Sequence, residues 1–433
     1  MKLLENKKTR ITFHAGILTI GGTIIEIQYE NSRIFFDFGS EYNPSSEKQP
    51  KNLKDLLEFE LAPKIDIYDK DIISYANNSK FENTAVFLSH VHLDHSKMVN
   101  YLDKDIPLYT LKGTKALLNT LNINNDFIFP LHKPSKKNIR EIIALEENET
   151  IFIGEIEVTI LPVDHDAFGA AALLIKTPDL TIAYSGDIRL HGYRESDSLE
   201  FCKKSFNCDI LLLEGVTVSF DDSEETSTES DKIEREFLSE PEALNKINKI
   251  IEDNPNRQLT FNYYISNIER IINIAKTCKR ELVLDAYHAY VVKEVSGVNI
   301  KYYSLDAKDY GLDKSLGVNF ETLINDESNY FWQLDKLALQ KLDSLKSGGI
   351  YIHSNAVPLG EFDPAYKPFM ESFEKQGLEV ISITSTGHAK PNDLQKIIDL
   401  IKPKLLIPIH SLKPERLINN HGERLLPEKG QTI

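Results

Sequence analysis

Four side chains that commonly bind metal ions fall within six residues: His90, His92, Asp94 and His95. They follow the apolar run 85–88, which reads as a strand, so the histidines at 90 and 92 project to the same side of an extended backbone. If a helix begins there, Asp94 and His95 turn toward a second, adjacent cation. Imidazole with carboxylate suits zinc, and also manganese or iron, better than calcium. The spacing predicts a site for two cations; the alternative is a polar loop with chance histidines.

Two cations that share a site need more ligands than this segment supplies. Three further candidates each come just after an apolar run that reads as a buried strand, and they are His165, Asp187 and His410. On α/β folds, ligands collect at such strand ends. Taken singly, each reads better as a structural histidine or a capping aspartate than as a ligand, but together with the segment 90–95 they favour ligands. Asp37, after the run 34–36, is expected to orient a ligand or a bound water, the alternative being a turn-forming aspartate before Gly39.

The composition limits the classes of function. The 433 residues, 41% hydrophobic and 27% charged, suit a globular protein with two domains. The net charge of −16 argues against a broad basic surface that coats nucleic acid. The three cysteines lack the spacing of a thiolate metal site and fit a reducing cytoplasm. No secretion signal and no stretch of membrane-spanning length is evident, so we expect a cytoplasmic protein without a membrane partner.

The elements expected from the pattern form two α/β stretches. Short β-like runs separated by polar turns fill the first half, with a helix expected over 113–121 and a buried strand over 209–214. Acidic residues between 221 and 231 then cluster among serines and threonines, which is typical of a solvated linker. A second stretch follows, with helices expected over 242–253, 267–278, 368–376 and 392–401, and strands over 258–261, 281–284, 349–353, 378–384 and 405–409.

The candidate ligands together resemble the metallo-β-lactamase fold, an αββα sandwich. Its HxHxDH signature is matched by the segment 90–95, its later histidine by His165, its bridging aspartate by Asp187 and its last histidine by His410. The resemblance implies that one metal is held by His90, His92 and His165. It implies that the other is held by Asp94, His95 and His410, with Asp187 and a hydroxide shared between the two cations.

The region after Glu214 is similar to the inserted α/β domain called β-CASP, found in ribonuclease J and in cleavage and polyadenylation endonucleases. The similarity rests on Glu214, on the segment 261–270 with Ser266 and Arg270, and on the segment 386–410. It implies a metallo-β-lactamase domain over 1–215, a β-CASP-like inserted domain over 216–376 and a closing part over 377–433.

The family resemblance also assigns roles in RNA cleavage, which would take place in a cleft between the two domains. Asp94 and Asp187 would fix the hydroxide, and His388 would stabilise the developing charge or protonate the leaving oxygen. Glu214 would orient His388; the alternative is a plain strand-end acid. Surface solvation is the alternative for Arg270. Substrate contacts are expected from four residues: Thr386, Gly387, Arg270 and Ser266.

Some segments depart from the family pattern. Thr384 and Thr386 replace the first histidine and the serine of its His-x-Ser-Gly-His phosphate grip, and a large C-terminal domain does not follow His410. Both departures count against a 5′-phosphate pocket. The leading hypothesis is thus a ribonuclease with two divalent ions, Zn²⁺ or alternatively Mn²⁺, and by analogy a homodimer. The alternatives are a small-molecule metallohydrolase of lactones, thioesters or phosphodiesters, and a metal-free binding module.

Overall fold

The computed structural model describes residues 2–41, 49–74, 80–133, 137–220 and 238–433. The chain divides into two compact units, one made of Met1–Glu234 with Gly387–Ile433 and the other of Arg235–Thr386. The domain boundaries expected at 215/216 and 376/377 remain expectations. The predicted acidic linker lies outside the described residues.

The first unit contains two sheets that face one another. Strands of the first sheet, in spatial order, are β1 (Arg10–Ala15), β2 (Ile24–Tyr29), β3 (Ser32–Phe36), β4 (Asn83–Phe87), β5 (Leu108–Leu111) and β6 (Ile143–Leu145). Strands of the second are β19 (Glu423–Arg424), β18 (Leu405–Ile409), β11 (Ile210–Glu214), β10 (Thr181–Tyr184), β9 (Ala171–Lys176), β8 (Ile156–Pro162) and β7 (Thr150–Ile153).

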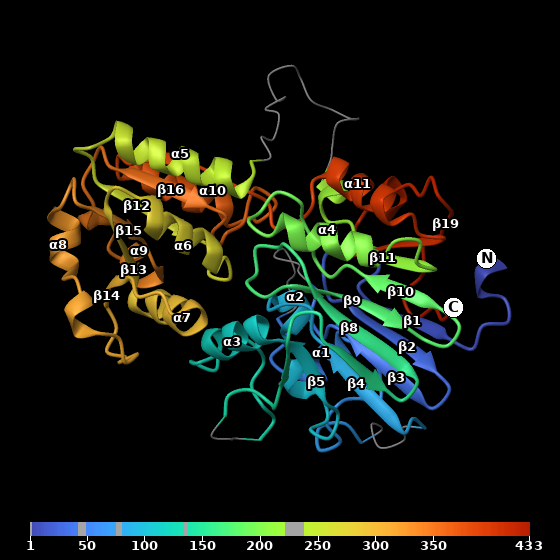
Figure 1. Cartoon of the computed structure of the whole chain (residues 1–433). Helices are drawn as coiled ribbons and strands as arrows, with labels where there is room; N and C mark the ends of the chain where they lie inside the picture. Colours follow the sequence, from blue (N-terminus) through green and yellow to red (C-terminus); the bar gives the residue numbers. More distant parts are fainter. Residues whose placement is uncertain (1, 42–48, 75–79, 134–136, 221–237) are drawn as a thin grey trace. The chain divides into compact units, whose positions relative to one another are not determined.

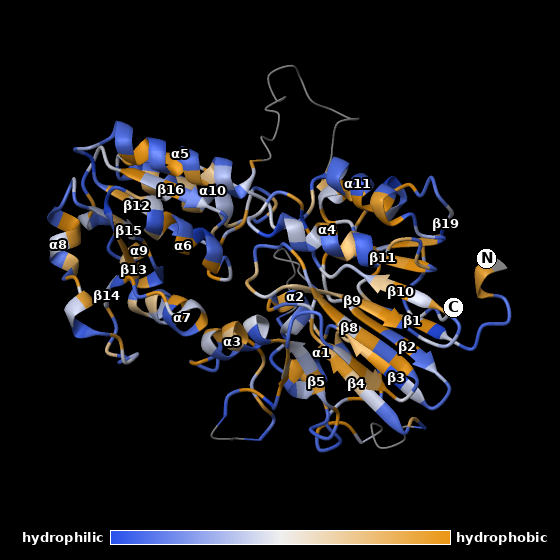
Figure 2. Ribbon diagram, viewed as in Figure 1, coloured by the Kyte–Doolittle hydropathy of each residue, from blue (hydrophilic) through white to orange (hydrophobic). Residues whose placement is uncertain are grey.

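Alternation along the strands makes the core between the sheets. Ile25 and Ile27 of β2 join one buried apolar cluster with Ile182 of β10 and Ile407 of β18. Because strand side chains alternate between faces, every second residue of both sheets points into this layer. Figure 2 shows the apolar residues along these strands.

Helices cover the outer faces of the two sheets. On the second sheet, α4 (Glu195–Lys204) and α11 (Pro391–Ile401) bury apolar residues against β8, β11 and β18. Figure 1 shows both helices on the same side of this sheet. The helix α3 (Lys112–Leu121) lies beside β5 and β6 of the first sheet and buries Leu117 and Leu118. Two shorter helices complete this part of the unit, α1 (Leu53–Glu58) and α2 (Leu93–Ser96). The αββα sandwich expected from the sequence is confirmed.

The second unit is built on a sheet whose paired strands all run parallel. Its strands, in spatial order, are β14 (Lys301–Tyr303), β13 (Glu281–Asp285), β15 (Tyr330–Gln333), β12 (Leu259–Tyr263), β16 (Ile350–Ser354) and β17 (Glu379–Ser382). Helix α5 (Glu240–Asp253) precedes the first strand of this sheet. Helices connect the strands that follow, as parallel pairing requires: α6 (Ile268–Thr277), α7 (Ala286–Ser296), α8 (Phe320–Asn325), α9 (Lys336–Leu339) and α10 (Tyr366–Lys375). The additional α/β domain expected from the sequence is confirmed.

Helices within the described ranges are too short or too polar to cross a bilayer.

Candidate metal centre

The first metal-binding segment changes from strand to helix within a few residues. His90 follows β4, and His92 is the residue that precedes α2. Asp94 and His95 lie on α2 itself. Because a helix turns successive side chains by about 100°, the change from strand to helix makes the donors of this segment point in two different directions.

The structure brings the seven predicted ligands together in two clusters. The first ligand group contains His90, His92, His165 and Asp187, and the second ligand group contains Asp94, His95 and His410. Within each group the donor atoms lie within 4.8 Å of one another.

Asp187 lies between the two groups. Its Oδ2 is 3.5 Å from Nε2 of His90, 3.3 Å from Nε2 of His95 and 3.7 Å from Nε2 of His165. On its other side, Oδ1 is 3.0 Å from Nδ1 of His410. One carboxylate thus contacts imidazoles of both groups, as a bridging ligand would.

The donor set fits divalent cations. Among the described residues, Nε2 of His90, His95 and His410 and Oδ2 of Asp187 are buried without a hydrogen-bond partner. Buried polar atoms are nearly always satisfied, so atoms of this kind that converge call for a bound ion. Ligands around a zinc ion at about 2.0–2.2 Å lie roughly 3.4 Å apart. Spacings of that size occur here, such as 3.1 Å from Nε2 of His165 to Nδ1 of His92.

Burial and neighbouring carboxylates shift the pKa values of the candidate histidine ligands in opposite directions. Burial lowers the pKa values of all three imidazoles of the first ligand group, that of His165 to about 3. These rings are therefore neutral, which a ligand must be. Burial also disfavours the charged form of His410, but the carboxylates of Asp187 and Asp94 raise its pKa to about 10. The carboxylates thus favour positive charge at this point.

Asp37 contacts the ring of His95, a member of the second ligand group. Its Oδ1 accepts a hydrogen bond from the backbone N–H of Ser89 at 2.7 Å. Its Oδ2 accepts from the hydroxyls of Ser89 and Tyr184 and lies 2.8 Å from Nδ1 of His95. The contact leaves Nε2 of His95 directed at Asp94 and Asp187.

Two glycines, Gly39 and Gly21, make room for α2. A Cβ added to Gly39 would lie 1.9 Å from the backbone of Asp94, and one added to Gly21 would lie 2.2 Å from the Asp94 side chain. Hydrogen bonds hold the same contact, since Phe38 N donates to His95 O at 2.7 Å. The only signal in the sequence is the glycines themselves.

His388 and Glu214 lie at the edge of the first ligand group. Nδ1 of His388 is 3.2 Å from Oε1 of Glu214 and 3.7 Å from Oδ2 of Asp187. The His388 side chain is 21% exposed, whereas Glu214 is buried. Burial disfavours the imidazolium of His388, but Glu214 and Asp187 outweigh it and raise the pKa of this ring.

The predicted substrate contacts are divided between the two units. Gly387 belongs to the first unit, and its carbonyl oxygen is 2.6 Å from Nδ1 of His165. Thr386, Ser266 and Arg270 belong to the second unit, where Ser266 and Arg270 are buried. The guanidinium of Arg270 is engaged at Nε and at both terminal nitrogens by Glu240, Ser354, Asn355 and Ser385.

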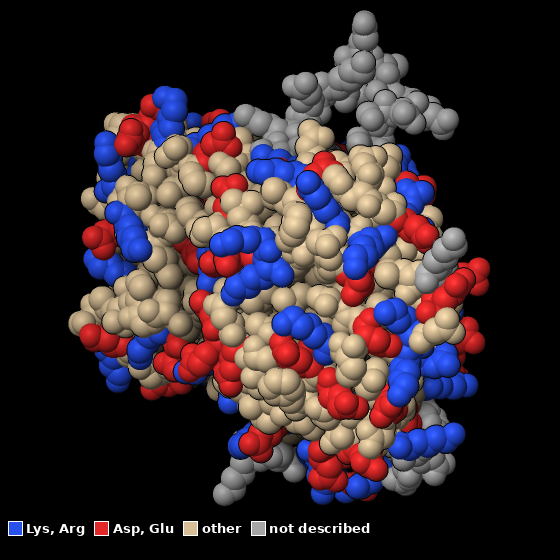
Figure 3. Space-filling view, turned by 45° about the vertical axis from the view of Figure 1, so that its right-hand side comes forward, with Lys and Arg blue, Asp and Glu red and all other residues tan. Residues whose placement is uncertain are grey.

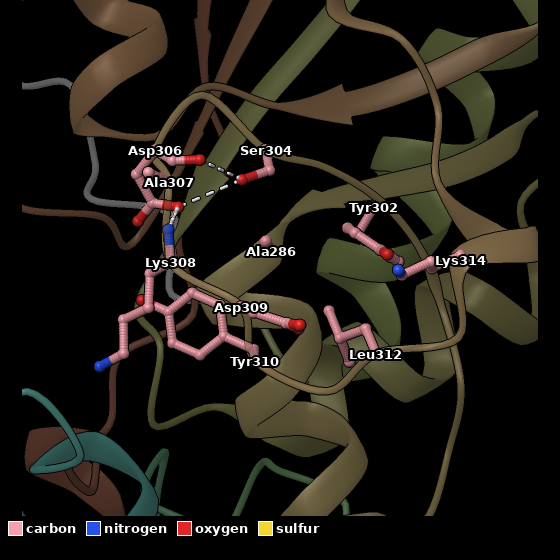
Figure 4. A pocket seen from close by; sticks show the side chains of 10 residues that line it. All are labelled: Ala286, Tyr302, Ser304, Asp306, Ala307, Lys308, Asp309, Tyr310, Leu312 and Lys314. Carbon is pink, nitrogen blue, oxygen red and sulfur yellow. Dashed lines mark hydrogen bonds between the residues drawn. The ribbon is translucent and has the colours of Figure 1, made fainter.

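One cavity of about 200 Å³ lies in the second unit, beside the start of α7 (Figure 4). Its lining mixes Lys308 and Lys314 with Asp306 and Asp309. No sequence motif pointed to it, and the mixed charges select no ligand class.

Comparison with known proteins agrees with the family resemblance that was inferred from the pattern of candidate ligands. The Beta-lactamase superfamily domain matches residues 79–234. Ribonuclease J of Mycoplasma genitalium is 26% identical over 96% of this chain and 70% of its own length, and ribonuclease J of Pyrococcus abyssi is 22% identical over 96% and 92%. A crystal structure of a protein of unknown function from Enterococcus faecalis is 44% identical, with a TM-score of 0.91, covering 99% of this chain and all of that one. The chain is a hydrolase with the metallo-β-lactamase fold, and it is similar to ribonuclease J along most of its length.

Proposed function

We propose that this protein is a metal-dependent ribonuclease that hydrolyses phosphodiester bonds of RNA. The convergence of seven donors in two ligand groups that share Asp187 is the observation that carries the proposal. The choice of RNA is supported by relatives named ribonuclease J, two of which align with 96% of this chain.

The donor chemistry favours two divalent ions, one in each ligand group. Imidazole nitrogens prefer Zn²⁺, and the carboxylates also accept Mn²⁺. When bound, such ions lower the pKa of water and neutralise the charge of a phosphodiester. The residues of the chain then position the reactants around them.

Asp187 and Asp94 are proposed to orient the attacking water. Asp187 contacts both groups, and Oδ2 of Asp94 is 3.2 Å from Nε2 of His410. These carboxylates can accept hydrogen bonds from a water lying between the groups. Asp37 supports them indirectly, because it fixes the ring of His95.

His388 is proposed to protonate the leaving oxygen. The raised pKa keeps more of this ring protonated near neutral pH, and its partly exposed position lets a substrate reach it. Glu214 holds Nδ1, so Nε2 is the nitrogen that would donate the proton. The pair Glu214–His388 thus combines orientation with charge.

Because the chain is acidic overall, the negative charge of the RNA phosphates has to be neutralised locally, at the site of cleavage. The net charge is −16, and on the face shown in Figure 3 acidic and basic side chains are interspersed. A continuous basic surface of the kind that coats nucleic acid is not needed if metal ions neutralise the phosphate at the point of cleavage.

The finer features of the function remain proposals from the family resemblance. They are a β-CASP character of the second unit, a substrate cleft, contacts from Thr386, Gly387 and Ser266, a homodimer and a cytoplasmic location. Arg270 also remains in this set, although its donors already bind neighbouring residues.

Digestion of end-labelled RNA tests the proposed function. We expect cleavage of 5′-monophosphate and 5′-triphosphate RNA by the zinc- or manganese-loaded protein, lost on chelation and on Asp94→Ala or His95→Ala with circular dichroism unchanged. The control is His421→Ala, since that histidine pairs with Asp399 on the surface. Metal binding with no RNA cleavage, but with turnover of a lactone, thioester or small phosphodiester, would replace the proposal by the small-molecule hydrolase.

A further inference from the structure

Asp166 is a carboxylate beside the first ligand group that the canonical ligand pattern does not include. We propose that Asp166 is an additional positioning residue of the metal centre, and that its negative charge strengthens cation binding by His90, His92 and His165. The inference rests on the metal centre of the proposed function and adds a residue to it.

The carboxylate faces two of the three imidazoles. Oδ1 of Asp166 is 3.4 Å from Nε2 of His165 and 3.6 Å from Nε2 of His92. The residue is only 8% exposed. Nδ1 of His165 is held by the carbonyl of Gly387, so Nε2 is the nitrogen directed at the ligand group. Asp166 therefore lies beside a donor nitrogen.

The backbone around Asp166 fixes this position. Val163 N donates to Ala170 O at 3.1 Å, and Ala170 N donates to Ala167 O at 3.2 Å, which closes the loop that contains Asp166. Gly387 makes room for the carboxylate, because a Cβ at that position would lie 2.3 Å from Oδ1. The glycine that holds His165 by its carbonyl thus also admits Asp166.

The charges of the two ligand groups explain what the carboxylate adds. The second ligand group has its own carboxylate, Asp94, beside the shared Asp187. The first has neutral imidazoles and only the shared Asp187. With Asp166 counted, each group has one carboxylate of its own. Attraction between opposite charges is stronger in a buried site than in water, so this addition favours the first cation.

A purely structural role for Asp166 is the competing explanation, because Arg189 also lies close enough to affect its charge. Asp164 provides the matched control. It is also buried, at 1% exposure, in the same segment, and its carboxylate accepts hydrogen bonds from Nε of Arg189 at 3.2 Å and from the N–H of Gly192 at 2.7 Å. Removing either charge disturbs this neighbourhood, but only Asp166 contacts the imidazoles.

The experiment is titration of the metal-free protein with Zn²⁺ against a coloured chelator. Asp166→Asn should weaken one of the two sites by about 10–100-fold, the range seen for residues that support a metal ligand. Asp164→Asn should change both affinities less than about threefold. Asp166→Ser is the second variant if Asp166→Asn does not fold, and circular dichroism establishes folding in each case.

Two backgrounds assign the effect to one group. In His410→Ala, which impairs the second ligand group, Asp166→Asn should still weaken the remaining site. In His165→Ala, which impairs the first, it should have no further effect. The visible spectrum of the Co²⁺-loaded protein should change with Asp166→Asn and not with Asp164→Asn, because the spectrum reports the surroundings of the ion.

The outcomes distinguish failure of the role proposed for Asp166 from failure of the metal centre itself. Two sites in the parent protein and a selective loss in Asp166→Asn support the inference. Unchanged affinities in Asp166→Asn overturn it and leave the metal centre standing. Absence of Zn²⁺ binding by the parent protein overturns the metal centre and the inference together.

Discussion

Arg270 and Glu240 form a two-pronged ion pair inside the second unit, with Nη2 2.7 Å from Oε1 and Nε 2.9 Å from Oε2. Both side chains are almost fully buried, at 1% and 0% exposure. A buried pair of this geometry joins α5 to α6 and leaves an uncompensated charge if one partner is removed. The arginine that the sequence offered as a phosphate contact thus also connects two helices of this unit.

Glu240→Ala should therefore destabilise the second unit by about 3–5 kcal/mol. The single tryptophan, Trp332, is buried on β15, so its fluorescence reports urea unfolding of this unit. The control is Glu252→Ala on the same helix, whose partner Lys279 is exposed, with an expected loss under about 1 kcal/mol. Equal losses in the two variants would contradict the role given to the buried pair.

Asp285 should make the stability of the second unit depend on pH. Burial, with the charges of Asp335 and Asp306, raises its pKa to about 7. The unfolded chain has an aspartate pKa of about 3.9, so the folded state holds the proton more tightly between these values. The free energy of unfolding contributed by this group is therefore present below about pH 4 and is lost as the pH rises to about 7.

Asp285→Asn removes the titrating group and keeps a side chain that can cap α7, since Asp285 accepts from His288 N at 3.1 Å. The loss of stability between pH 5 and pH 8, followed by Trp332 fluorescence, should be smaller in this variant than in the parent. A parallel loss in both proteins would show that Asp285 does not titrate in this range.

Glu214→Gln and His388→Ala test the proton donor. His388→Ala should lower kcat by about 10²–10⁴-fold, the usual contribution of a general acid. Glu214→Gln should lower kcat by a smaller factor, because it leaves a hydrogen-bonding partner for Nδ1 but removes the charge. Both proteins should keep two metal ions by elemental analysis. Wild-type kcat in His388→Ala would exclude this residue as the acid.

Gly39→Ala tests the contact between the first sheet and α2. The added methyl group would overlap the backbone of Asp94, so α2 must move and carry the donors of the second ligand group with it. A displacement of this kind should cost at least about tenfold in kcat/KM and in the affinity of one Zn²⁺ site. Gly360→Ala, where the new atom meets only a Phe362 side chain, is the control. Equal metal affinity in both variants would mean that α2 tolerates the displacement.

The donors could be predicted from sequence because each one has two local signals. His165, Asp187 and His410 are metal-binding residue types, and each comes just past an apolar run long enough to be a strand. Asp166 has only the first signal and directly follows a predicted ligand, so nothing in the sequence separated it from a loop aspartate. Its position beside His92 depends on the folding of two distant segments.

Other parts of the fold could not be predicted from the sequence, for different reasons. The helix α7 has apolar residues on several sides, so periodicity does not distinguish it from a strand. The strand β15 has only four residues, all with aromatic or amide side chains, and the last three of them are buried in the sheet. The ion pair of Arg270 could not be predicted, because its partner Glu240 lies 30 residues away and no local pattern indicates that pairing.

The second sheet places β18, and with it His410, directly beside β11, although the whole second unit lies between them in the chain. A ribosome therefore finishes the insertion before it makes the last metal-binding histidine. The segment around His90 must wait for some 300 residues of synthesis before its partners exist, about 15–60 s at ordinary translation rates. The proposed metal centre therefore cannot be completed on a nascent chain that ends before His410, and any activity that depends on it must be absent until that residue has been added.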